Sequence, residues 1–177
     1  MSEAPPREPT VQEMIDIWQA HTMSEFAFRD ADASVTTLTD DAHVLLVPIQ
    51  VGANGKPAVR EFYANSFLPQ IPPDMEVVPV SRTVGQSQLV DEAIYRFTHS
   101  VQMDWFLPGV PPTGRRIEFV LVGIIRFRDN LICSEHLYWD HATVLAQLGL
   151  LDPSATPGGV TGASSAQQLL AWSTGAG

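Results

Sequence analysis

Apolar residues in the first third of the chain recur at the spacing of helices that bury one face. Residues 10–13 read Thr-Val-Gln-Glu, a spacing at which two side chains cap a helix start, so a helix is expected from Val11. Its apolar stripe continues through Trp18 and Thr22 to Phe26 and should face the core. Two further helices are expected over residues 30–38 and 57–68, the second opening with a proline that suits a first helical turn.

Polar and apolar positions alternate from Met75 onward, which is the period of β-strands. Strands are predicted over residues 75–84, 92–105, 117–127 and 131–139. An earlier short strand is expected at residues 42–47, with a Gly-Ala-Asn-Gly turn after it at residues 52–55. Helices followed by a long antiparallel sheet indicate an α+β domain, with the helices packed on one face of a curved sheet.

The composition at the two ends differs from that of the middle. Residues 1–9 are acidic and proline-rich and are expected to be a disordered lead-in. Residues 152–162 are rich in Pro, Gly and Ser and are expected to form a linker to a weak terminal helix at residues 163–172. A single domain is therefore expected over residues 10–151.

Charge and cysteine content narrow the class of protein. The sequence has 20 acidic and 10 basic side chains, a formal net charge of −10, which disfavours nucleic acid and anionic membrane surfaces as partners. The single cysteine, Cys133, excludes an intramolecular disulfide framework and any multi-cysteine metal site. No run approaches the ~18 apolar residues of a membrane-spanning helix, and a cytoplasmic location is expected.

Five short segments, taken together and in this order, are similar to one known superfamily. They are Thr39-Asp-Asp-Ala-His-Val44, Gly55-Lys-Pro-Ala-Val-Arg-Glu-Phe-Tyr63, Pro112-Thr-Gly-Arg-Arg116, Ile125-Arg-Phe-Arg-Asp-Asn130 and Tyr138-Trp139-Asp140. The chain resembles the nuclear-transport-factor-2-like superfamily, and within it the SnoaL-like branch that includes polyketide cyclases. The resemblance implies a mixed, mainly antiparallel six-stranded sheet curved into a cone, with three helices on its concave face. It also implies a small hydrophobic ligand in the cone, no cofactor, and a homodimer formed through the convex sheet face.

The catalytic positions of well-known relatives are not kept. The base of ketosteroid isomerases matches Leu46, the acidic donor on the penultimate strand matches Gly123, and the tyrosine of the first helix matches Thr22. The resemblance therefore implies the fold without implying those relatives' mechanism.

Two ionisable residues are expected to face the cone. The resemblance implies that Glu135 lies on the inward face of the last strand, and alternation places His99 on the inward face of the long strand. The two side chains should then lie about 10 Å apart across Gly123. A carboxyl group in apolar surroundings and an imidazole can supply an acid and a base at neutral pH, so Glu135 and His99 are the catalytic candidates. The alternative is that His99 is a core histidine and that Glu135 pairs with Arg82 or Arg96. Substrate-binding residues are expected to be Trp18, Thr22, Tyr63, Tyr95, Phe97, Gly123, Leu137 and Trp139.

A metal site is not expected. His136, Asp140 and His141 include potential ligands, but His136 and Asp140 should point outward, and the sequence shows no third ligand at a suitable spacing.

The function that these observations favour is acid–base catalysis on a small, hydrophobic, oxygenated molecule. Cyclase, isomerase, dehydratase and epoxide hydrolase chemistry all stay open. The alternatives are a binding module without catalysis, or a dimerisation module that uses the outward apolar row Val120, Val122 and Ile124.

Overall fold

The computed structural model describes residues 9–155 and 157–174 of the chain. The helices are α1 (Val11–Met23), α2 (Ala31–Val35), α3 (Lys56–Phe62), α4 (His141–Gln147) and α5 (Ser164–Ser173). The strands are β1 (Leu38–Leu46), β2 (Val51–Asn54), β3 (Glu76–Val84), β4 (Gln88–Thr98), β5 (Arg116–Arg128) and β6 (Leu131–Trp139).

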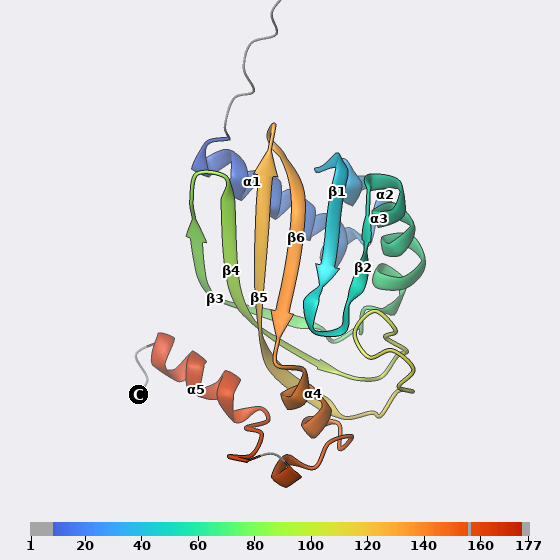
Figure 1. Cartoon of the computed structure of the whole chain (residues 1–177), viewed down its shortest axis with the longest axis vertical. Coiled ribbons are helices and arrows are strands. Elements are labelled where there is room, and N and C mark those ends of the chain that lie inside the picture. Colours follow the sequence, from blue (N-terminus) through green and yellow to red (C-terminus); the bar gives the residue numbers. More distant parts are fainter. Residues whose placement is uncertain (1–8, 156, 175–177) are drawn as a thin grey trace, which may run out of the picture.

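The strands form one six-stranded sheet in the order β2-β1-β6-β5-β4-β3. Strands β1 and β6 run parallel, and all other neighbours are antiparallel. Figure 1 shows α1 crossing behind β4, β5 and β6, while α3 lies beside β1 and β2. The expected α+β fold with a mixed, mainly antiparallel sheet is confirmed, and its helix-covered face encloses the core.

The start of α1 is the predicted capping box. The backbone N–H of Thr10 donates to the Glu13 carboxylate at 2.8 Å, and the Glu13 N–H donates to the Thr10 hydroxyl at 3.2 Å. The helix continues into a π-helical turn, Ser24–Phe28, which ends at Arg29 in the left-handed conformation. A π-helical turn widens the helix and is common at functional sites.

Two elements differ from the sequence prediction around β1. The second helix ends at Val35, and β1 begins at Leu38. Residues 52–55, predicted as a turn, mostly belong to strand β2, which pairs with β1. Gly52 allows this pairing, because a Cβ there would lie 2.0 Å from the carbonyl oxygen of Val44. The glycine therefore permits a close approach of two strands where the sequence suggested a turn.

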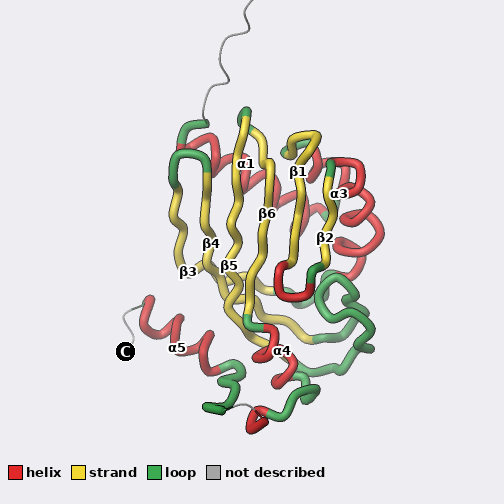
Figure 2. Tube along the Cα trace, viewed as in Figure 1, coloured by secondary structure: helices red, strands yellow, loops and turns green. Residues whose placement is uncertain are grey.

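Strand β4 is shifted relative to the prediction. It begins at Gln88 and ends at Thr98, whereas the alternation suggested residues 92–105. Met103 and Trp105, which continue the alternation, lie in the loop after β4 and are buried, so their alternation reflects burial within an irregular loop. Most loop structure, green in Figure 2, lies at the end of the sheet nearest α4.

The outer face of the sheet carries the apolar row Val120, Val122 and Ile124, all half-buried in the single chain. Helix α5 contacts β5 and leaves Trp172 mostly exposed. None of the helices in the described part of the chain combines the length and apolar character needed to cross a membrane.

Candidate active site

A cavity of about 680 Å³ lies between α1 and the inner face of the sheet. Its walls are mainly aromatic and aliphatic, and the π-helical turn and β3 contribute to them. All eight residues expected to bind a substrate line this cavity: Trp18, Thr22, Tyr63, Tyr95, Phe97, Gly123, Leu137 and Trp139. Such a volume accommodates a small organic molecule.

Glu135 also lines the cavity and is only 4% exposed. The pairing of β5 with β6 shifts by one residue just before Glu135: Ile132 pairs with Phe127, whereas Ser134 pairs with Arg126. Neither arginine considered as its partner reaches it, since Arg82 binds Asp91 and Arg96 binds Glu118. The alternative in which an arginine neutralises Glu135 is therefore wrong.

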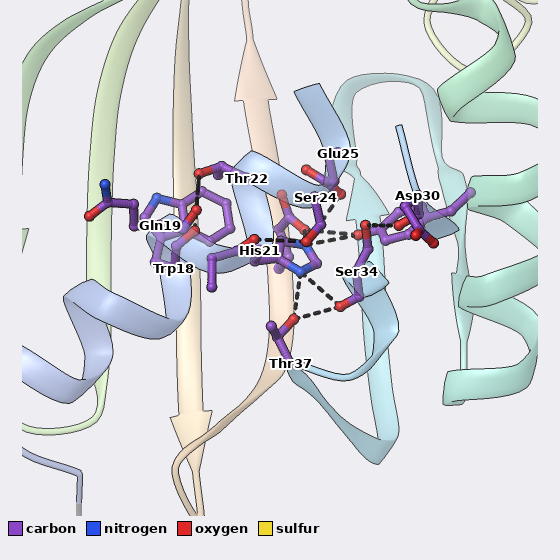
Figure 3. Close-up of polar contacts among 12 residues, drawn as sticks. Trp18, Gln19, His21, Thr22, Ser24, Glu25, Asp30, Ser34 and Thr37 are labelled. Carbon is purple, nitrogen blue, oxygen red and sulfur yellow. Dashed lines mark hydrogen bonds and ion pairs between the residues drawn. The ribbon is translucent and has the colours of Figure 1, made fainter. Parts of the chain in front are cut away.

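The actual partner of Glu135 is His21, which α1 places in the core (Figure 3). His21 Nε2 lies 3.6 Å from Glu135 Oε2 and 3.2 Å from Glu25 Oε1, and all three residues are buried. Tyr63 completes the cluster, since its hydroxyl lies 3.2 Å from His21 Nε2 and donates to Glu135 Oε2 at 3.4 Å. We call His21, Glu25, Glu135 and Tyr63 the buried acid–base cluster.

The other ring nitrogen of His21 fixes the orientation of the imidazole. Thr37 Oγ1 donates its hydrogen to the carbonyl oxygen of Ser34 at 2.6 Å. The same hydroxyl oxygen lies 2.7 Å from His21 Nδ1, so it accepts a hydrogen bond from the Nδ1–H group. Nδ1 therefore carries a hydrogen and faces Ser34 and Thr37, whereas Nε2 faces the carboxyl groups of Glu25 (Figure 3) and Glu135.

Burial and mutual charge shift the pKa values within the cluster. Burial alone would lower the pKa of His21, but the charge of Glu25 and hydrogen bonds with Glu135 and Glu25 outweigh it and raise the pKa to about 10. Burial raises the pKa of Glu135, and the charge of Glu25 adds to this effect while His21 opposes it. Burial also raises the pKa of Tyr63 well above its usual value. At neutral pH the cluster therefore holds an imidazolium, a neutral phenol and a carboxyl group that retains its proton more strongly than usual.

His21 and Glu25 were not identified as candidates from the sequence. The helical stripe was assigned to Trp18, Thr22 and Phe26, and Glu135 was the one carboxyl group expected to face the cone, whereas Glu25 is also buried and lines the cavity. A signal was present, because His21 and Glu25 are spaced i, i+4 and flank that stripe. The widened turn at Ser24–Phe28 brings Glu25 inward, and sequence periodicity does not reveal such a turn.

The predicted pairing of His99 with Glu135 across Gly123 is wrong. Gly123 pairs with Asp91 on β4, and Glu135 pairs with Ile125 on β5. His99 follows the end of β4, is buried beside Thr113, and does not line the cavity. Alternation gives the face of the sheet on which a residue lies but not the residue of the neighbouring strand that it pairs with. Positions 91 and 99 are an even number of residues apart, so alternation alone cannot tell which of them lies opposite Gly123.

The residues considered for a metal site have other partners. His136 contacts His43 with 2.9 Å between their Nε2 atoms, Asp140 caps α4, and His141 accepts a hydrogen bond from the Trp139 indole. Within the described residues, the group with the geometry to hold a metal ion is His21, Glu25 and Glu135, whose ligand atoms lie within 4.8 Å of one another. His21 would have to give up its Nε2 proton to become a ligand.

The rim of the cavity holds a second polar group. Arg82 forms two hydrogen bonds with Asp91, at 2.5 and 2.7 Å, and the Trp18 indole donates to the same carboxylate at 2.5 Å. The Trp18 ring stacks on His21, with 5.6 Å between ring centroids and 21° between planes. The rim is therefore connected to the buried acid–base cluster through Trp18.

Comparison with solved structures shows the same fold in several proteins. A protein named as a SnoaL-like polyketide cyclase, from a Jannaschia species, is 19% identical with a TM-score of 0.62, covering 89% of this chain and 99% of that one. A protein of ketosteroid isomerase-like fold from Catenulispora acidiphila, solved with trimethylamine, is 20% identical with a TM-score of 0.57, covering 80% and 98%. SalBIII, an epoxide hydrolase/cyclase-like enzyme of pyran ring formation in the polyether salinomycin, is 19% identical with a TM-score of 0.55, covering 73% and 92%. At these identities the likeness concerns the fold.

Sequence comparison gives the family directly. No curated protein sequence matches the chain significantly. The model of the SnoaL-like domain matches residues 11–135, which include α1, the sheet through Glu135 and the whole buried acid–base cluster. The chain therefore belongs to the SnoaL-like domain family.

Proposed function

We propose that this protein is an enzyme that acts by general acid–base catalysis on a small, hydrophobic, oxygenated molecule in the cavity. The observation that carries the proposal is a buried carboxyl group, Glu135, facing an apolar cavity and joined through His21 Nε2 to a second buried carboxyl group, Glu25. Both carboxyl groups line the cavity, so both are available to a bound molecule. Acid and base groups placed together in this way perform proton transfer to and from a substrate.

The two carboxyl groups have different roles in this proposal. Glu135, whose pKa is raised, donates its proton to an oxygen atom of the substrate. Glu25 accepts the proton of the attacking group, which is a water molecule or a hydroxyl group of the substrate. His21 Nε2 contacts both carboxyl groups, so it can pass a proton to Glu135 and take one from Glu25, which restores the starting state. Every proton that enters the substrate is thereby balanced by one that leaves it.

Tyr63 and Thr37 support these roles. The Tyr63 hydroxyl donates to Glu135 Oε2, which leaves Oε1 as the oxygen to which no hydrogen bond is recorded among the described residues. Thr37 keeps the imidazole oriented with Nε2 toward the carboxyl groups. Two fold neighbours support a small-molecule reaction in this type of cavity, since one is named as a polyketide cyclase and one as epoxide hydrolase/cyclase-like.

The test uses Glu135→Gln, which preserves shape but cannot donate an acidic proton. Purified protein is assayed by mass spectrometry against a panel of apolar epoxides, hydroxyepoxides and benzylic alcohols in ¹⁸O-labelled water. Glu135→Gln should lower the turnover number at least about a hundredfold while ligand affinity is retained. Glu61→Gln is the matched control, because Glu61 is exposed and lies outside the cavity lining, and it should behave as wild type. Near-normal turnover of Glu135→Gln would contradict the proposal, and binding without turnover across the panel would favour a carrier.

A further inference from the structure

The groups that face the cavity favour positive charge on a bound molecule. Four acidic residues line it, namely Glu25, Asp91, Glu92 and Glu135. Within the described residues, Arg82 is the only Arg or Lys on the lining, and Asp91 already binds it at two positions. His21 carries a positive charge but does not line the cavity, so a ligand meets the carboxyl groups first.

Aromatic rings line the same cavity as these carboxyl groups. Phe26 follows Glu25 directly, and its ring makes edge contacts with Phe67 and Tyr95 at centroid distances of 6.1 and 6.4 Å. All three rings line the cavity. The faces of aromatic rings attract cations, and a cation next to both aromatic rings and a carboxylate is stabilised by both.

The donors needed to stabilise a negatively charged intermediate are engaged elsewhere. The Tyr63 hydroxyl donates to Glu135, and both the Trp18 indole and Arg82 donate to Asp91. Trp105 Nε1 has no hydrogen-bond partner in the described part of the chain, and as a neutral N–H it can orient a ligand oxygen without offsetting carboxylate charge. An enolate requires donors directed at its oxygen, and it would form here beside Glu25 and Glu135.

From this arrangement we infer that the cavity stabilises a positively charged transition state and selects organic cations over neutral and anionic molecules of the same shape. The inference rests on the proposed function and narrows it to reactions in which a C–O bond breaks and leaves positive charge on the carbon.

In such a reaction the carbon–oxygen electron pair leaves with the oxygen, which takes the proton of Glu135, and positive charge develops on the carbon. The oxygen of water or of a substrate hydroxyl then adds to that carbon and loses its proton to Glu25. Epoxide opening and cyclisation follow this course. In dehydration no oxygen adds, and Glu25 instead takes a proton from the carbon next to the positive charge, whose C–H electron pair forms the C=C bond. Isomerisation through an enolate develops negative charge and does not follow this course.

A permanently charged ammonium ion imitates the charge of that transition state, so binding tests the inference without turnover. Three probes share one aromatic body: (2-naphthylmethyl)trimethylammonium, 2-naphthylmethanol and 2-naphthoate. Isothermal titration calorimetry at neutral pH and moderate salt should show the ammonium ion binding at least about tenfold more tightly than the alcohol. Naphthoate should bind more weakly than the alcohol, because its charge has the same sign as that of Glu25.

Variants assign the effect to the buried carboxyl group. Glu25→Gln should lose most of the preference for the ammonium ion while still binding the alcohol, whereas Glu61→Gln should keep the preference. The inference would be overturned by equal binding of ammonium ion and alcohol, by tighter binding of naphthoate, or by binding of none of the probes. An unchanged preference in Glu25→Gln would overturn it as well. The proposed function is judged separately by turnover, so an enzyme that requires Glu135 but prefers naphthoate would refute only the inference.

Discussion

The charge of His21 should make the stability of this protein depend on pH above neutrality. A proton bound with a pKa of about 10 in the folded chain, against about 6.5 when unfolded, contributes about 5 kcal/mol to the free energy of unfolding. Because the folded pKa is the higher one, this stabilisation is fully present below pH 6.5 and is lost as the pH rises toward 10. About half of this stabilisation is lost between pH 7 and pH 9.

Other groups do not reverse this trend. The raised pKa of Glu135 has the same sign, since its folded form also retains a proton that the unfolded chain releases. Burial lowers the pKa values of three other histidines, His99, His136 and His141. Their contributions to the free energy of unfolding therefore change below pH 6.5, outside the range from pH 7 to pH 9. The slope between pH 7 and pH 9 therefore reports on the buried acid–base cluster.

The assay is urea denaturation followed by tryptophan fluorescence at pH 7, 8 and 9. Wild type should lose about 2 to 3 kcal/mol over this range, while His21→Gln should lose less than about 1 kcal/mol. His141→Gln is the control and should keep the wild-type slope. Should His21→Gln fail to fold, NMR titration of the His21 ring in wild type replaces it. A flat wild-type profile, or a His21 ring that titrates near 6.5, would refute the charged state of the cluster.

Two other predictions concern the outer sheet face and the loop after β4. We propose a homodimer through the outer face, where covering Val120, Val122 and Ile124 contributes several kcal/mol at about 25 cal/mol per Å² of apolar area. Val122→Asp should therefore yield monomer or aggregate in analytical ultracentrifugation, and a wild type that sediments as a monomer at micromolar concentration would exclude the dimer. His99→Gln should keep the turnover number within about twofold, because His99 lies outside the cavity, while lost hydrogen bonds lower the unfolding free energy by about 1 kcal/mol. A hundredfold fall in the turnover number of His99→Gln would show that His99 takes part in the reaction.

The sequence predicted the fold more fully than the chemistry. Helical spacing and the capping box located the start of α1. Alternation together with the family resemblance identified the inward faces of β4, β5 and β6, so the cavity-lining residues could be named in advance. Strand β2 was missed because Gly52 is typical of turns, although here it serves close strand pairing.

The site was predicted only in part for two physical reasons. Alternation determines the face of a sheet but not the register between strands, so His99 was placed opposite Gly123, where the structure has Asp91. The π-helical turn after α1 breaks the helical period just where Glu25 enters the core, so the polar pair His21 and Glu25 did not stand out from the apolar stripe. Glu135 was identifiable because a single carboxylate interrupts an apolar inward row.

The most direct test of the central claim is the titration of the Glu135 carboxyl group in the folded protein. The ¹³C signal of its side-chain carboxyl carbon, assigned by comparison with Glu135→Gln, is followed by NMR from pH 3 to pH 9. A buried acid poised to donate a proton predicts a midpoint clearly above the ordinary value of 4.5 and a response to replacement of His21. A midpoint at or below 4.5 would mean that Glu135 is an ordinary carboxylate at neutral pH, and the acid–base account of this cavity would be wrong.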